Sequence, residues 1–148
     1  MVDAFRAAFN ARDLDALTAL MLETGSVEIV GVHTEYGSEM ARNGSFVGML
    51  YGSSRRSGED PRGGMDPVHR LGVLSTPARV EAREHCGERI LVHWYAHADG
   101  EYVRAISRLE TDSGRVARIR NYFYTPEFMA HVAGDMGLPF HVNGYRYW

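Results

Sequence analysis

The sequence predicts a domain of the α+β class, in which helices at both ends of the chain pack with an antiparallel sheet. Tight turns are signalled at residues 85–88, 98–101 and 111–114, each with a glycine where a sharp reversal needs a positive φ angle. From residue 78 onward these turns separate four strands rich in β-branched and aromatic residues. Two apolar stripes at helical spacing precede the strands, and a well-marked helix start follows them.

The pairing of strands 89–97 and 102–109 decides which side chains share a face. If residues 99 and 100 form a two-residue loop, Trp94 lies opposite Ala105. That face is almost wholly apolar, and a bulge in the third turn extends it onto strand 115–124. We expect Trp94, Ser107 and Asn121 to be its inward groups that are not simply hydrophobic.

The opposite face of these strands is rich in tyrosine and arginine. Because both residue types combine a large contact area with a hydrogen-bonding tip, we expect this face to meet a partner. The alternative is that arginine stems simply lie over surface tyrosines. The residues of this face are His93, Tyr95, Tyr102, Arg104, Ile106, Arg108, Arg118, Arg120, Tyr122 and Tyr124.

The composition predicts one globular domain over residues 1–148. With 45% hydrophobic and 24% charged residues, a chain of 148 residues can bury a core but has no room for a second domain. A formal net charge of −3 gives no overall attraction to nucleic acid. No apolar run is long enough to span a bilayer, and no secretory leader is apparent, so the cytoplasm is the expected compartment.

The single cysteine, Cys86, lies in a predicted turn. It can form no internal disulfide and no cysteine-based metal cluster. Nothing in the sequence pairs it with a base, so we expect a surface thiol rather than a catalytic one.

Two amphipathic helices open the chain. Their apolar stripes are Val2, Phe5 and Phe9 in the first helix and Leu14, Leu17, Leu20 and Met21 in the second. Asp13 is the predicted N-cap of the second helix. Gly25 is expected to end that helix, and residues 26–30 read as a short strand.

The middle of the chain is predicted to be rich in loops. Residues 31–37 form a polar, aromatic loop, and Ser38 can cap a short helix over residues 39–43. Residues 52–67 have almost no hydrophobic content and read as a long loop of the kind that forms lids or binding loops. A further short element is expected at 68–74.

A helix should begin after the last strand. Thr125 supplies an N-cap hydroxyl, Pro126 fits the first helical position, and Glu127 adds an acid in the first turn. Gly137 stops this helix. The tail at 138–148 is aromatic to its end, so we expect it to pack against the domain or a partner.

The order of these elements, with Asn-Ala-Arg-Asp-Leu-Asp-Ala at residues 10–16, resembles the nuclear transport factor 2-like superfamily and its SnoaL-like branch. The resemblance covers most of the chain. It implies a curved sheet wrapped around helices into a cone, with a pocket at the wide end. It also implies a homodimer formed through the outer sheet face.

A narrower resemblance attaches to residues 119–127, 137–140 and 143–148. These segments are similar to the SnoaL-like extension at the C-terminus of certain extracytoplasmic-function RNA polymerase sigma factors. The resemblance implies a role in transcription regulation, with sigma-factor core domains or RNA polymerase as partners. No helix-turn-helix pattern occurs in this chain, so we expect no direct binding of nucleic acid by this domain.

Enzymes of the superfamily commonly place an acid near the inner end of a late strand, where this chain has Asn121. An amide cannot take a proton from carbon or water, which weakens the case for an enzyme. Substitute acids and bases are His33, Glu35, Asp66 and His69, of which His69 and Asp66 are the candidate catalytic pair.

An apolar pocket with few polar groups is the usual small-molecule site. Its expected lining is Tyr36, Tyr51, Trp94 and Phe123, with Ser107 and Asn121 as polar fixtures. The alternative is that Trp94 and Phe123 only fill the core.

The leading hypothesis is therefore a ligand-binding or protein-contact domain, either a sigma-factor extension or a stand-alone relative, for a small apolar ligand. The second is a small cyclase, isomerase or hydrolase acting on an apolar cyclic substrate, and the third is a scaffold that works through dimerisation. No metal and no cofactor is expected, because no cluster of His and carboxylate residues has ligand spacing.

Overall fold

The computed structural model describes residues 1–51 and 77–141 of the chain. The predicted loop at 52–67, the predicted element at 68–74 and the tail beyond 141 lie outside this part. So do the candidate catalytic residues Asp66 and His69.

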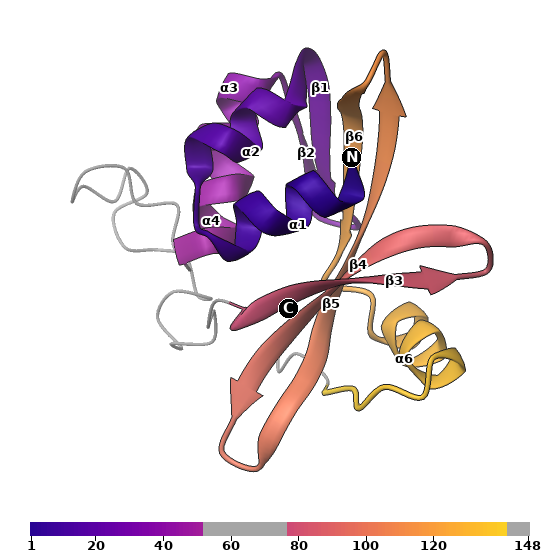
Figure 1. The fold of residues 1–148 in the computed structure, drawn as a ribbon. Coiled ribbons are helices and arrows are strands. Elements are labelled where there is room, and N and C mark those ends of the chain that lie inside the picture. The colour runs from indigo at the N-terminus through magenta and orange to yellow at the C-terminus, as the bar shows by residue number, and fades with distance from the viewer. Residues whose placement is uncertain (52–76, 142–148) are drawn as a thin grey trace.

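A six-stranded sheet in the order β2-β1-β6-β5-β4-β3 forms the centre of the fold (Figure 1). Its strands are β1 (Met21–Ile29), β2 (His33–Tyr36), β3 (Arg79–His85), β4 (Glu88–His97), β5 (Gly100–Asp112) and β6 (Arg115–Tyr122). All neighbours are antiparallel except β1 and β6, which run parallel. The four antiparallel strands predicted from the turn signals are confirmed.

The first two strands differ from the prediction. Gly25 does not end a helix, because β1 begins at Met21, directly after the second helix. A Cβ at Gly25 would lie 3.0 Å from the Leu22 carbonyl oxygen and 3.2 Å from that of Ala117, so glycine allows this close approach of two backbones. The expected loop at 31–37 contains the edge strand β2, whose polar sequence suits its exposed position.

The helices are α1 (Val2–Asn10), α2 (Leu14–Leu20), α3 (Ser38–Ala41), the π-helix η1 (Arg42–Phe46), α4 (Val47–Tyr51) and α6 (Pro126–Asp135). Asp13 caps α2 as predicted, because its side chain accepts a hydrogen bond from the Ala16 amide at 2.8 Å. Ser38 opens α3 without capping it, and helical structure continues to Tyr51 rather than ending near residue 43. Thr125 occupies the N-cap of α6 but makes no capping bond.

The helices cover both faces of the sheet. α1 to α4 lie on one face, here called the inner face, and α6 lies on the other, called the α6 face (Figure 1). The buried sheet residues of the main cluster on the inner face are Val27, Val80, Leu91, Val116 and Ile119, which pack with the helices. The buried residues on the α6 face are Ile90, Val92, Trp94, Val103 and Ile106, with Met129 and Val132 of α6.

The predicted register of the β4–β5 hairpin is wrong. His97 pairs with Gly100, so the loop is residues 98 and 99, and Trp94 lies opposite Val103. An irregularity follows, after which His93 lies opposite Ala105. Because side chains alternate between faces, these shifts place Trp94 on the α6 face and bring His93 to the inner face.

The expected open face of tyrosine and arginine is also changed. Ile106 is buried on the α6 face. The ring of Tyr122 packs against that of Phe128 of α6, with the ring centroids 4.3 Å apart. Tyr95 and Arg104 are buried, with the Arg104 guanidinium 5.0 Å from the Tyr95 ring. The protein itself covers these positions. Ile106 and Tyr122 lie under α6, which the prediction did not allow for, whereas Tyr95 belongs to the inner face. Dimer formation stays a prediction.

The sequence analysis expected the tail to pack against the domain or a partner. Its described start, residues 138–141, packs on the domain. β6 pairs with β5 only as far as Ile106. The Val103 amide donates to the Pro139 carbonyl at 2.9 Å, and the His141 amide donates to the Val103 carbonyl at 3.1 Å. The tail thus continues the sheet where β6 ends. Within the described residues, no helix is long and apolar enough to cross a membrane.

Replacing Gly44 by alanine should destabilise the fold through Glu35. A Cβ at Gly44 would lie 2.0 Å from Glu35 Oε1, while Glu35 Oε2 accepts the Ser45 amide hydrogen bond at 2.9 Å. We expect Gly44→Ala to lower the free energy of unfolding by roughly 1–3 kcal/mol, since the carboxylate must move and leave a buried amide unpaired. Urea unfolding measures this change.

Gly48→Ala is the matched control, because a Cβ at Gly48 meets nothing within 4 Å. An alanine there should be neutral or stabilise the helix by up to about 1 kcal/mol. Equal losses in the two variants would contradict the role of Glu35. The role of Glu35 would also be contradicted if Gly44→Ala lowered the free energy of unfolding equally in the wild type and in a Glu35→Ala variant.

Candidate functional site

Three polar side chains are buried side by side on the inner face of the sheet. His93 of β4, Ser107 of β5 and Asn121 of β6 are 1%, 2% and 3% exposed. Ser107 pairs directly with Asn121, and His93 is opposite Ala105, two residues from Ser107 on the same face. The three strands therefore bring these groups together in an otherwise apolar interior.

Ser107 links the three side chains. The Asn121 amide donates from Nδ2 to Ser107 Oγ at 3.0 Å, and His93 Nε2 lies 2.9 Å from the same oxygen. A hydroxyl has one proton to donate, and its oxygen already accepts from Asn121. The tautomer of His93 that is protonated at Nδ1 lets Nε2 accept the Ser107 proton, so that the chain of donors runs from Asn121 through Ser107 to His93.

His93 is uncharged at neutral pH. Burial in the core lowers its pKa from 6.5 to about 3, because the interior disfavours the imidazolium form. Its ring contacts Phe9 of α1 edge-on at a centroid distance of 5.3 Å. A base with so low a pKa is poorly matched to proton transfer near neutral pH. The chain formed by His93, Ser107 and Asn121 is therefore suited to hydrogen bonding rather than to acid–base catalysis.

One hydrogen-bonding partner of the Asn121 amide is weak. The second contact of Asn121 Nδ2 is to the thioether sulfur of Met49 at 3.4 Å. A thioether is a poor acceptor, so this buried amide proton gains little from it. Met49 lies on α4, near the end of the first described range, and its flexible side chain can adapt to a neighbour.

An aromatic cluster continues the inner face toward the β4–β5 hairpin. Tyr95 and Phe123 each follow a member of the polar chain by two residues, and their rings lie 6.2 Å apart. Ala105 completes the buried part, and Tyr124 packs against it. Burial raises the pKa of Tyr95, with the Arg104 guanidinium partly opposing that effect. The Tyr95 hydroxyl is thus a neutral donor next to an apolar surface.

The predicted pocket lining is only partly assembled. Ser107, Asn121 and Phe123 share the inner face, but Trp94 lies on the α6 face, where its Nε1 donates to Glu81 at 3.0 Å. The other two predicted residues are exposed at the surface, Tyr36 by 73% and Tyr51 by 53%. Tyr36 lines a separate pocket of about 660 Å³ over α3.

Of the substitute acids and bases, Glu35 has a structural role. It holds the Ser45 amide, and its other oxygen lies 3.6 Å from His33 Nε2. The described ranges contain no group of three or more His, Cys, Asp or Glu side chains placed to hold a metal ion.

The sequence analysis missed His93 as an inward residue. The run from Ile90 to Ala96 is apolar almost throughout, which is typical of a strand buried on both faces. That feature could have indicated that His93 would be buried whichever face of the sheet it was assigned to. The irregularity next to Trp94 has no comparable signal in the sequence.

Comparison with known proteins gives matches among solved structures. No family model and no curated protein matches the chain. An NTF2-like protein of unknown function from Cytophaga hutchinsonii ATCC 33406 superposes with a TM-score of 0.50 at 14% identity, over 82% of this chain and 85% of that chain. An LEH-like epoxide hydrolase from M. tuberculosis superposes with a TM-score of 0.50 at 15% identity, over 92% and 89%. At such identities the likeness concerns the fold.

The burial of His93 predicts a pH dependence of stability. Because its pKa falls from 6.5 to about 3 on folding, the unfolded chain binds more protons between these values, and stability must fall as the pH is lowered through this window. The loss by the acid end is on the order of 5 kcal/mol, at about 1.4 kcal/mol per pH unit. Urea unfolding at a series of pH values measures it.

A His93→Gln variant should be less stable at neutral pH but show a flatter dependence on pH than the wild type. His131→Gln is the control, since this histidine is exposed on α6. An acid slope in His93→Gln equal to that of the wild type would show that His93 does not titrate as described.

Proposed function

We propose that this chain, which has the nuclear transport factor 2-like fold expected from its sequence, binds a small, largely apolar molecule against the inner face of its sheet. The proposed ligand carries an oxygen that accepts a hydrogen bond from Asn121. The observation that supports this most strongly is the buried amide proton of Asn121 whose acceptor, within residues 1–51 and 77–141, is the Met49 sulfur. A ligand oxygen in place of that sulfur makes a stronger hydrogen bond.

The surroundings of Asn121 suit such a ligand. Phe9, Phe123 and Tyr95 present aromatic surface on the same face, next to the uncharged side chains of His93 and Ser107. The Arg104 guanidinium lies 5.0 Å from the Tyr95 ring. Apolar walls with a few fixed polar groups are typical of small-molecule sites. His93 and Ser107 hold the Asn121 side chain in one orientation, so the donor is already positioned before a ligand arrives.

The neutral polar chain favours binding over catalysis. Proton abstraction near neutral pH needs a base with a pKa close to the working pH, and His93 is far from it. The alternative of a cyclase, isomerase or hydrolase with His69 or Asp66 as base depends on residues outside the described ranges. It stays a prediction.

A narrower form of the proposal is that the domain is the regulatory extension of a sigma factor. Its support is the resemblance of residues 119–127 to such extensions. The coding sequence upstream in the native gene tests it. Polymerase-binding and helix-turn-helix domains there would support this form, and a stop codon directly upstream would overturn it without affecting ligand binding.

Binding of a bicyclic ketone tests the general proposal. We expect 1-tetralone to bind the wild-type protein more tightly than tetralin, the same ring system without the oxygen. One hydrogen bond to the ketone, worth about 1 kcal/mol, predicts a preference of about fivefold. Calorimetry measures the affinities, and NMR shifts of the Asn121 side-chain amide locate the site.

Asn121→Leu should abolish this preference, because the donor is lost while the apolar volume is kept. Ser107→Ala should weaken it, since the Asn121 amide is then less firmly oriented. Tyr36→Ser is the control, because this exposed tyrosine lies outside the inner face. An unchanged preference in Asn121→Leu, or shifts that map to the pocket at Tyr36, would overturn the proposal.

A further inference from the structure

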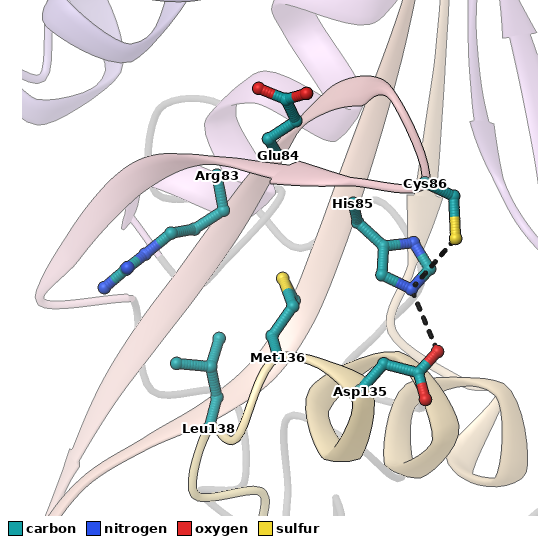
Figure 2. A pocket seen from close by; sticks show the side chains of 7 residues that line it. All are labelled: Arg83, Glu84, His85, Cys86, Asp135, Met136 and Leu138. Atoms are coloured by element: carbon teal, nitrogen blue, oxygen red, sulfur yellow. Dashed lines mark hydrogen bonds and ion pairs between the residues drawn. The ribbon is translucent and has the colours of Figure 1, made fainter.

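The segment that follows α6, residues 136–141, returns to the sheet from a fixed starting point. At the end of α6, Asp135 Oδ2 lies 3.2 Å from His85 Nε2 of β3 (Figure 2). This contact borders a pocket of about 390 Å³, which Leu138 also lines. Leu138 and Phe140 then pack against the apolar cluster under α6. The first part of the segment is therefore held mainly by apolar contacts, which do not depend on pH.

The end of the segment is held by a stack of two imidazole rings. The His141 ring lies over the ring of His97 of β4, with the centroids 4.3 Å apart and an angle of 22° between the planes. The Tyr102 ring meets both edge-on, at centroid distances of 5.3 Å from His97 and 5.5 Å from His141. The His141 amide also donates to the Val103 carbonyl at 3.1 Å. The ring stack and this hydrogen bond together hold His141 on β5.

One nitrogen of His97 has no acceptor for a second ring proton. Its Nε2 atom is buried and makes no hydrogen bond within residues 1–51 and 77–141. A neutral imidazole can carry its proton on Nδ1 and leave Nε2 as an acceptor. Protonation would add a charged N–H donor at this buried position, where it costs free energy unless it finds a partner. The His85 ring differs, because the Asp135 carboxylate faces its Nε2.

Two cationic or potentially cationic groups also face His97. Partial burial lowers the pKa of His97 below 6.5, and His141 and the Arg104 guanidinium of β5 lower it further. A proton on His97 would place three positive groups at one end of the sheet. The neutral form of the His97 ring is therefore the one that fits the stack.

The acids of the same hairpin do not reverse this balance. Asp99 opposes the lowering of the His97 pKa, but its Oδ2 already accepts a hydrogen bond from the Tyr102 hydroxyl at 3.0 Å. Glu101 is paired with the Arg79 guanidinium at 3.1 Å. Both carboxylates thus have other partners.

We propose that the stack of His97 and His141 is a pH-sensitive latch, which holds His141 on β5 while the rings are neutral and releases it when His97 takes up a proton. Release breaks the hydrogen bond to the Val103 carbonyl and lets the His97 ring reach water. Leu138 and Phe140 keep the preceding residues in place. Solvent supplies the proton, and binding on the inner face is not required.

The direction of the pH dependence follows from linkage. The latched state keeps the pKa of His97 below 6.5, so it binds fewer protons than the released state. The latch is therefore closed above 6.5 and must weaken as the pH falls below this value. The site that opens is local, because the contacts of Leu138 and Phe140 carry no charge.

Exchange of single backbone amides with water, measured by NMR at about pH 7 and about pH 5, tests the latch. The His141 amide reports it, and the Val103 amide, which donates to the Pro139 carbonyl, is the internal reference. Relative to the intrinsic rate, we expect the protection of the His141 amide to fall about threefold or more in acid, while that of Val103 changes little. Unchanged protection of His141 would overturn the proposal. Equal losses at both amides would overturn it as well, because the whole segment or the domain would then open.

His97→Phe tests the role of the proton. Phenylalanine keeps an aromatic ring against His141 but cannot be protonated, so the protection of the His141 amide should become independent of pH. His33→Phe is the matched control, since this histidine is half-exposed on β2 at the opposite edge of the sheet. It should leave the pH dependence of the wild type. A wild-type pH dependence in His97→Phe would overturn the assignment to His97.

His97→Lys tests the role of charge from the other direction. Its ammonium group is charged at both pH values, so the His141 amide should show at neutral pH the low protection that the wild type shows in acid. The Val103 amide shows whether this variant keeps its fold. Wild-type protection of His141 at neutral pH in His97→Lys would contradict the latch, and His97→Phe decides the question if His97→Lys does not fold.

Discussion

The hydrogen bond between Asn121 and Ser107 is the interaction on which the account of the inner face depends. It joins the two central strands β5 and β6, and it positions Ser107 against His93. A buried polar group without a partner costs about 1–3 kcal/mol, so the three side chains stabilise the fold only as a connected set. The same requirement fixes the direction of the Asn121 amide and leaves its second proton facing the Met49 sulfur.

Helices cover the sheet on both sides. The N-terminal helices enclose the polar chain, whereas α6 buries Ile106 and Trp94 and brings Asp135 to the β3–β4 turn. A ligand on the inner face would therefore lie in a different layer of the molecule from the surface around α6.

Much of the fold could be predicted from local signals. The turns at 85–88 and 111–114, the cap at Asp13 and the proline at the start of α6 each depend on a few neighbouring residues, and all are present in the structure. The strand β2 and the start of β1 could not be predicted in this way. The start of β1 depends on pairing with β6, which is distant in the sequence, and the polar sequence of β2 resembles a loop.

The site was predicted less well, for a physical reason. A shift of register by one residue moves every side chain of a strand to the other face, and the register of β4 was set by a two-residue loop and an irregularity near Trp94. Ser107 and Asn121 were assigned to the inner face correctly, whereas Trp94 and His93 were interchanged. The contact of His85 with Asp135 depends on the docking of α6, which no local pattern indicates.

A crystal structure of the protein soaked with 1-tetralone tests the central claim most directly. The account predicts the ketone oxygen within hydrogen-bonding distance of Asn121 Nδ2, in the place of the Met49 sulfur, with the ring against Phe123. Met49 still in contact with Asn121 and the ketone at another site, or absent, would contradict it.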